Sequence, residues 1–311
     1  MKLRRLAGTA LGLAGAVVVG NRLLRTRAGA LENPLPGIER TYRWRGIDVK
    51  YTVAGDPDAP NALLLHGVNA AASSYEFEPV FERLSERYRV FAVDLPGFGR
   101  SDRPPLVYSS EIYVEFVRDF IADVTDDPVV FASSLTGSFA VEAVREADGN
   151  VDRLILICPT DETGEERPWL RTLVRTPVIG TALFNALASK PSLRYFMARE
   201  GYYDDENIEE EELEYAWRCA HQKGARYAPA SFAAGTLDPE LDLQTALAEL
   251  DVPTTLVWGR DAELVPLRDG RTLADEADLD LVVIDYATLL PHAEHPETFL
   301  EFIEAELPPA E

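Results

Sequence analysis

The chain is poor in cysteine, and this shortage limits the classes of protein to which it can belong. Cys158 and Cys219 are the only two cysteines among 311 residues, and neither lies in a C-x-x-C spacing. Two cysteines are too few for a disulfide framework, so the sequence fits a reducing compartment. It also has no zinc-ligand spacing, no P-loop and no G-x-G-x-x-G stretch. The sequence therefore indicates neither a metal nor a cofactor.

Basic residues are scarce as well, and lysine above all. The chain has 30 lysines and arginines, of which only four are lysine, against 53 acids, which gives a formal net charge of −23. Nucleic acid is excluded as a partner, because phosphate binding needs a basic face. An acidic surface with little lysine stays hydrated in concentrated salt, which also screens its self-repulsion. We therefore predict a halophilic protein, with an acidic protein of low-salt cells as the alternative.

Residues 1–27 differ from the rest, because they carry six bases and no acid. An uncharged apolar stretch at residues 6–20 lies between basic clusters. With leucines up to residue 24 and snorkelling arginines, it predicts membrane association through residues 6–24, as an uncleaved anchor. A removed signal peptide and a peripheral amphipathic tail are the alternatives. The arginines that follow the apolar stretch place the globular domain on the cytoplasmic side.

After a linker at residues 28–38, apolar strand-like runs alternate with amphipathic helices. This alternation predicts an α/β protein with a mostly parallel central sheet covered by helices on both faces. We expect its core to comprise residues 39–159 and 251–311. Residues 160–250 break the rhythm with a mainly helical stretch, which predicts an inserted helical lid above the carboxyl ends of the strands. We interpret the acidic run at residues 204–214, inside this stretch, as a solvent-exposed helix face.

Five short segments fall, in order, at the ends of these expected elements. They are Leu65–Val68, Asp94–Ser101, Ala132–Gly137, Val257–Gly259 and Leu290–Phe299. Together, over residues 40–307, they resemble the α/β-hydrolase superfamily. The resemblance implies an α/β-hydrolase fold with a helical lid. It also implies hydrolysis of an ester or a similar acyl substrate by a serine, a histidine and an acid.

Ser134 occupies the nucleophile position of this resemblance. A strand must turn sharply into a helix there so that the central side chain projects over the edge of the sheet. The backbone N–H groups of Val68 and Leu135 are then expected to form the oxyanion hole. A serine that merely caps the following helix is the alternative.

The other two triad positions are not filled by the family's residues. The resemblance puts the acid at Ala262, between Asp261 and Glu263, and the catalytic histidine at Leu289. A shift of one residue in the loop would make Asp261 the acid, and Asp161 is a second acid position in the superfamily. A serine hydroxyl is unreactive until a base takes its proton, so these gaps bear directly on activity.

Four histidines remain as candidate bases. His292 lies three residues beyond the gap and His221 lies on the expected lid, which makes these two the preferred candidates. His66, beside the oxyanion strand, and His295 are weaker alternatives.

Two functions follow. The chain is either a serine hydrolase of a small apolar ester, lactone or similar acyl substrate, with a non-standard base, or a catalytically degenerate binding or scaffold protein. A histidine within hydrogen-bond reach of Ser134 would distinguish the two.

Overall fold

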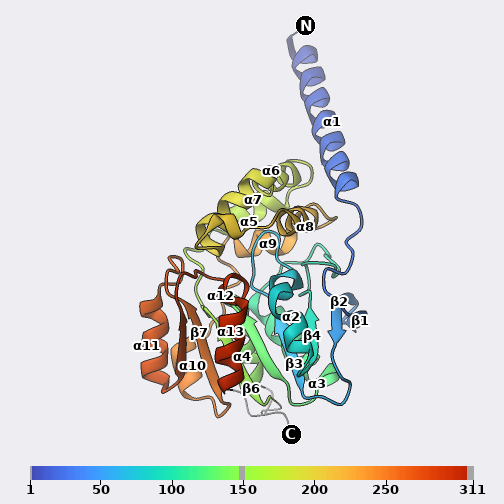
Figure 1. Cartoon of the computed structure of the whole chain (residues 1–311). Helices are drawn as coiled ribbons and strands as arrows, with labels where there is room; N and C mark the ends of the chain where they lie inside the picture. The colour runs from blue at the N-terminus through green and yellow to red at the C-terminus, as the bar shows by residue number, and fades with distance from the viewer. Residues whose placement is uncertain (1, 147–150, 307–311) are drawn as a thin grey trace.

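A computed structural model describes residues 2–146 and 151–306 of the chain (Figure 1). Residue 1 of the predicted anchor lies outside the described residues, as do residues 147–150 and 307–311 of the predicted core. The centre of the molecule is an eight-stranded sheet in the order β1-β2-β4-β3-β5-β6-β7-β8. The strands are β1 (Ile38–Trp44), β2 (Ile47–Ala54), β3 (Asn61–Leu65), β4 (Arg89–Val93), β5 (Val129–Ser133), β6 (Arg153–Ile157), β7 (Thr254–Gly259) and β8 (Asp280–Ile284).

The sheet is parallel from β4 to β8, and only the first two strands run against their neighbours. β1 pairs antiparallel with β2, and β2 pairs antiparallel with β4. The central strands are continuous apolar runs, such as the fully buried Leu63, Leu64 and Leu65 of β3, because both faces of a parallel sheet are covered. The predicted mostly parallel α/β architecture is confirmed.

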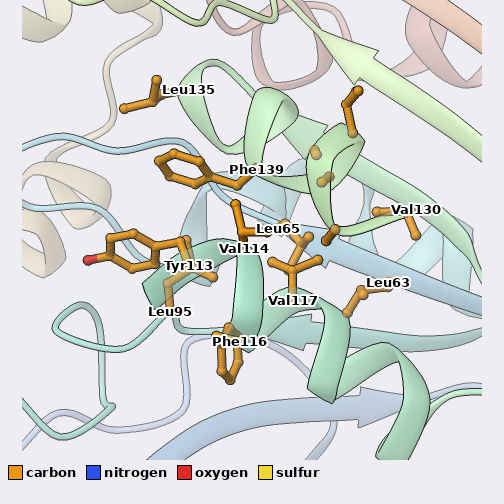
Figure 2. Close-up of a cluster of buried hydrophobic side chains, with 14 of the residues drawn as sticks. Leu63, Leu65, Leu95, Tyr113, Val114, Phe116, Val117, Val130, Leu135 and Phe139 are labelled. Carbon is orange, nitrogen blue, oxygen red and sulfur yellow. The ribbon is translucent and has the colours of Figure 1, made fainter. Parts of the chain in front are cut away.

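Two hydrophobic layers enclose the sheet, since successive side chains of a strand point to opposite faces. Leu63 and Val130 point to the layer formed with α3 and α4, where Phe116 and Phe139 are fully buried (Figure 2). Leu64, Phe131 and Ile155 point to the opposite layer, which α2 and α13 cover.

The helices that cover these layers come from both halves of the chain. One face carries α3 (Ser110–Val124), α4 (Leu135–Glu146), α10 (Leu243–Ala248) and α11 (Leu267–Ala277). The other carries η1 (Ser74–Phe77), α2 (Glu78–Ser85), α12 (Pro291–Glu294) and α13 (Pro296–Glu306).

A group of helices between β6 and β7 lies above the sheet (Figure 1). We call α5 to α9 the inserted helices; short turns η2 (Met197–Gly201) and η3 (Asp205–Asn207) connect some of them. Their bounds are α5 (Pro168–Arg175), α6 (Ile179–Leu187), α7 (Lys190–Phe196), α8 (Glu210–Ala220) and α9 (Tyr227–Phe232). Although α10 falls within the predicted insertion at residues 160–250, it packs on α4 and α11 beside the sheet.

The first helix, α1 (Lys2–Ala28), extends away from the body of the molecule and contacts it through α6 and α8 (Figure 1). Asn21 near its C-terminal end donates to the carbonyl of Val178 and accepts a hydrogen bond from Asn185. Among the residues that the structure describes, no helix combines the length and the apolar character needed to cross a membrane.

A buried carboxylate fixes the turn that follows β4. Asp94 is fully buried and accepts hydrogen bonds from the backbone N–H of Ser74 (2.7 Å) and from Nε of Arg100 (2.6 Å). Gly99 has a φ of +47°, and a Cβ there would stand 2.2 Å from the Asp94 carboxyl carbon. Glycine is therefore required at position 99 both because the Asp94 carboxyl group leaves no room for a Cβ and because the φ is positive.

Candidate active site

Ser134 lies at the turn from β5 into α4, with a φ of 53°. A non-glycine residue in this left-handed region is strained and persists only where its surroundings hold it. Here its N–H donates to the carbonyl of Ile157 on the neighbouring strand (2.8 Å), and Gly137 N–H donates to its carbonyl (2.9 Å). A Cβ on Gly137 would stand 2.9 Å from Cβ of Pro159, so the close passage of α4 requires glycine there. The sharp strand–helix turn predicted from the sequence is thus present at Ser134.

The loop after β3 passes directly beside this turn. Gly67 has Ser133 Oγ and Ser134 Cβ within 3.3 and 3.4 Å of the position that its own Cβ would take. Thr136 Oγ1 donates to the carbonyl of His66 (2.8 Å), which ties α4 to the same loop. Val68 follows Gly67, and Leu135 begins α4 immediately after Ser134. The two residues predicted to form an oxyanion hole therefore lie on adjoining segments at the start of α4.

The four histidines do not line the cavity that contains Ser134, as the described residues show. Both ring nitrogens of buried His66 are engaged, Nδ1 with the carbonyl of Gly67 (2.7 Å) and Nε2 with the N–H of Leu95 (3.1 Å). Nδ1 of His221 lies 2.8 Å from the carbonyl of Trp217, and its ring lines a different cavity beside α1. Nε2 of His295 lies 2.8 Å from the carbonyl of Tyr286.

His292, the other predicted base, is fully buried in α12 between the rings of Phe77 and Phe299. Its Nε2 lies 3.5 Å from Oε1 of Glu76, and neither of its nitrogens makes a hydrogen bond. Glu76 lines the cavity at Ser134, whereas His292 does not. The structure thus brings His292 close to the site but behind a carboxylate.

The two positions that the resemblance assigns to the triad lie together. Leu289 lines the cavity and packs against a buried cluster that contains Ala262. The side chain of Asp261, the predicted acid, is exposed, as is that of Glu263. Asp161 lines the cavity, where its Oδ2 accepts a hydrogen bond from the backbone N–H of Leu243 (2.9 Å) at the start of α10.

Glu76 is the functional-site candidate that sequence reasoning missed. Its Oε2 accepts a hydrogen bond from the backbone N–H of Gly67 (2.9 Å), and its side chain is only 8% exposed. Burial by itself raises the pKa of this carboxyl. The neighbouring His292, His66 and Ser133 favour its charged form, and the pKa lies below its ordinary value. No sequence signal singles it out, because Glu76 is one of several acids in the helical stretch after the oxyanion segment, together with Glu78 and Glu82.

The cavity above Ser134 has a volume of about 1290 Å³ and lies between the sheet edge and the inserted helices. Apolar side chains from both parts line it, namely Val68, Phe184, Leu187, Leu193, Phe196, Met197, Leu289 and Leu290. Glu212 also lines it and accepts a hydrogen bond from the Tyr202 hydroxyl (2.9 Å). Burial raises the pKa of Glu212 to about 7. In the described part of the chain, no cluster of three or more histidine, cysteine or acidic residues is placed to hold a metal ion.

Comparisons with known proteins identify the family of this chain. A sequence model of the alpha/beta hydrolase family matches residues 62–302. The chain is 25% identical over 275 residues to a 2-hydroxy-6-oxo-6-(2'-aminophenyl)hexa-2,4-dienoic acid hydrolase of Metapseudomonas resinovorans, covering 84% of this chain and 88% of that protein. It is 24% identical over 259 residues to a pimeloyl-[acyl-carrier protein] methyl ester esterase of Aliivibrio salmonicida, covering 78% and 90%.

Solved structures show the same fold. The 2-hydroxy-6-oxo-6-phenylhexa-2,4-dienoate hydrolase of Rhodococcus sp. strain RHA1 superposes with a TM-score of 0.71 at 22% identity, covering 87% of this chain and 98% of that one. The matched family model extends from β3 to α13 and so includes Ser134, the loop after β3 and the position of Leu289. The chain belongs to the alpha/beta hydrolase family.

Proposed function

We propose that this protein is a serine hydrolase that cleaves a small, neutral, apolar ester or lactone with Ser134 as its nucleophile. The observation that carries the proposal is the φ of 53° at Ser134, on the wall of a large cavity. Strained backbone of this kind clusters at active sites, where it makes a nucleophile project. The hydrolases among the relatives of the chain support the same reaction type.

The N–H groups of Val68 and Leu135 are the proposed oxyanion hole. An ester carbonyl attacked by Ser134 gains negative charge on its oxygen, and backbone donors beside the nucleophile stabilise that charge. The positive end of the α4 dipole acts in the same direction. These groups are backbone atoms, so they do not depend on the missing histidine and acid.

The cavity lining favours a neutral substrate. Carboxylates such as Glu76, Glu78 and Glu212 line it, whereas the described lining residues include no arginine, lysine or histidine. A carboxylate substrate would be repelled and would find no cation to pair with. The dienoic acid named for the Metapseudomonas relative is therefore a poor model, and an uncharged ester is the better one.

The proposal is tested by labelling the protein with a neutral fluorophosphonate in high-salt buffer. Wild type is expected to be labelled, and Ser134→Ala is expected to lose all labelling while keeping its circular dichroism spectrum. Ser138→Ala is the matched control, because Ser138 lies in the same helix and donates only to the carbonyl of Leu135 (2.7 Å). Labelling that persists in Ser134→Ala would refute the assignment of the nucleophile.

A non-catalytic binding protein is the second candidate. It is favoured by the apolar Leu289 and Ala262 where the resemblance puts a histidine and an acid. An elbow and an oxyanion hole without a base retain only a small residual rate. Folded wild-type protein that resists the fluorophosphonate but binds a neutral ester analogue would support this function.

Membrane association through α1 and the inserted helices is proposed as well. Large apolar side chains are exposed on these helices, among them Val19, Leu23, Trp169, Ile179 and Leu187. A second cavity of about 610 Å³ lies between α1 and the inserted helices and is lined by Arg22, Arg25, Lys223 and Arg226, with no carboxylate among its described residues. In a chain of net charge −23, this local basic group suits anionic headgroups beside an apolar surface. The proposed surface is the cytoplasmic face of the membrane, whose anionic lipids attract basic segments.

A further inference from the structure

Glu76 and His292 form a buried pair directly behind the loop after β3. Glu76 lies on η1 with its Oε2 bonded to Gly67 N–H, and its Oε1 faces Nε2 of His292 at 3.5 Å. The His292 ring lies 5.0 Å from the ring of Phe77 and 5.8 Å from that of Phe299, centroid to centroid, so it cannot turn away freely. The carboxylate reaches the cavity, whereas the imidazole does not.

Several polar atoms of this cluster have no hydrogen-bond partner. They are Oε1 of Glu76, both ring nitrogens of His292 and Oγ of Ser133, and all four are inaccessible to solvent. Burying such atoms without partners costs stability, so a group of them needs an explanation. Glu76 interacts with both His292 and Ser133, so these groups form one coupled polar cluster, and Glu76 and Ser133 line the cavity that contains Ser134.

The same carboxylate lies beside Ser134. The position that a Cβ on Gly67 would take is 3.5 Å from Oε2 of Glu76 and 3.4 Å from Cβ of Ser134. Ser134 and Glu76 are therefore both next to Gly67, on the wall of the same cavity. A carboxylate placed this way can accept a proton from the serine hydroxyl directly or through one water.

We propose that Glu76 is the general base of Ser134 and that His292 is the positioning residue that holds it. This inference rests on the proposed serine hydrolase function. In the family a histidine takes the proton of the serine. Here Glu76 has that role, and His292 lies next to Glu76 on the side away from the cavity.

The reaction balances with Glu76 as the sole proton carrier. Ser134 Oγ attacks the ester carbonyl carbon and its proton moves to Glu76, while the carbonyl electrons move to the oxygen held by the oxyanion hole. The tetrahedral intermediate re-forms the carbonyl, the ester C–O bond breaks, and the alcohol leaves with the proton from Glu76. Water then attacks the acyl-enzyme and gives its proton to Glu76, and Ser134 recovers that proton as the carboxylic acid leaves.

The test is the rate of fluorophosphonate labelling of the full chain. Glu76→Gln keeps an oxygen to accept from Gly67 N–H but cannot take a proton. We expect it to lower the labelling rate by about 10²-fold or more, within the usual range for loss of a general base. Glu82→Gln is the matched control, because Glu82 is an exposed acid on α2 outside the cavity lining, and this change is expected to leave the rate unchanged. Glu76→Asp is expected to recover part of the rate.

The pH profile separates a carboxylate base from a histidine base. With Glu76 as base, labelling of wild type should stay constant as the pH falls through about 6.5, where an ordinary histidine would gain a proton. The groups that face Glu76 are His66, His292 and Ser133, with Glu212 and Tyr202 across the cavity. Glu212 titrates near the same pH, so the profile is measured in a Glu212→Gln background.

Gly67→Ala gives a second, independent variant if Glu76→Gln does not fold. Its methyl group would contact both Ser134 Cβ (3.4 Å) and Glu76 Oε2 (3.5 Å), and the φ of Gly67 is not in the left-handed region. We expect slower labelling with the pair itself intact. Labelled wild type with unchanged rate and profile in Glu76→Gln or Gly67→Ala would overturn this inference and leave the hydrolase proposal standing. Unlabelled wild type would overturn both.

Discussion

Leu289 packs against the buried apolar cluster that contains Ala262, and these are the two positions where the family resemblance puts a histidine and its acid. The loops after β7 and β8 are held together there by a hydrogen bond from Asp261 N–H to the carbonyl of Ala287 (2.9 Å). The loops that would carry the acid and the histidine of a triad are therefore present, but their side chains at these positions are those of Ala262 and Leu289. Ser134 lies across the same cavity from Leu289.

Rebuilding the triad should activate Ser134. The double variant Leu289→His with Ala262→Asp puts an imidazole at the cavity wall and a carboxylate next to it. Because an imidazole titrates near neutral pH, it is a stronger base than a carboxylate, and we expect fluorophosphonate labelling to accelerate by about 10²-fold. The measurement is the labelling rate at pH 8 in 3 M KCl.

Leu289→Asn with Ala262→Asp is the control for the rebuilt triad, since it adds polarity without a base. If this control were accelerated as much as the histidine variant, the gain would not come from proton transfer. If neither variant were accelerated, the loops would not present residues 262 and 289 as the resemblance implies.

The fold was predictable from the sequence because it depends on local patterns. Apolar runs such as Leu63–Leu65 predict strands, and a glycine such as Gly99 predicts a turn. Both patterns involve only residues that are close in the sequence. The turn at Ser134 was predictable for the same reason, since a strand, a small residue and a helix follow one another directly. The position of α10 was not predictable, because only its packing on α4 and α11 separates it from the other helices of the insertion.

The environment of Ser134 depends on contacts between residues far apart in the sequence. Glu76 and His292 are separated by more than two hundred residues, and no local pattern links them. Position 76 lies in an amphipathic stretch, where an acid is normally solvated. The sequence favoured His292 as the base, and only the three-dimensional structure shows Glu76 next to it.

Glu212 should make the stability of the protein depend on pH between about 5 and 7. Burial raises its pKa to about 7, so the folded state holds the proton more tightly than the unfolded state. This contribution is fully present below the unfolded pKa of about 4.3 and is lost as the pH rises through 7. Glu212→Gln removes the titratable carboxyl group but keeps an oxygen that can accept the hydrogen bond from the Tyr202 hydroxyl. Relative to wild type, it should be more stable at pH 8 than at pH 5 by about 2 kcal/mol, measured by urea unfolding.

Glu211→Gln is the control for the pH series, because Glu211 is the neighbour of Glu212 in α8 and its side chain is exposed. A difference between wild type and Glu212→Gln that does not change with pH would show that Glu212 titrates as it does in the unfolded chain.

Concentrated KCl should stabilise the protein. A net charge of −23 destabilises the compact state through self-repulsion, and salt screens that repulsion. We expect the Tm to rise by about 5 °C between 0.2 and 3 M KCl, a gain of roughly 3 kcal/mol for a chain of this size. Replacing the exposed Glu206, Glu209 and Glu211 by glutamine should reduce this dependence. A Tm that does not change with KCl would contradict the halophilic interpretation.

Binding to anionic vesicles should depend on the basic cavity beside α1. Arg22→Gln with Arg25→Gln removes two of its four charged side chains, each worth about 1 kcal/mol near an anionic surface. We expect the affinity for vesicles of phosphatidylglycerol and phosphatidylcholine, measured by cosedimentation, to weaken by about 30-fold at the lowest KCl concentration that keeps the protein folded. Neutral phosphatidylcholine vesicles should show weak binding for both proteins.

Two matched variants separate charge from apolar contact in this assay. Arg40→Gln with Arg43→Gln removes the same charge from exposed positions on β1 and should leave binding unchanged. Trp169→Ser with Ile179→Ser removes apolar side chains that are 65% and 68% exposed and should weaken binding to both kinds of vesicle. Equal losses in the α1 and β1 arginine variants would mean that overall charge, rather than the cavity beside α1, controls the attraction to the membrane.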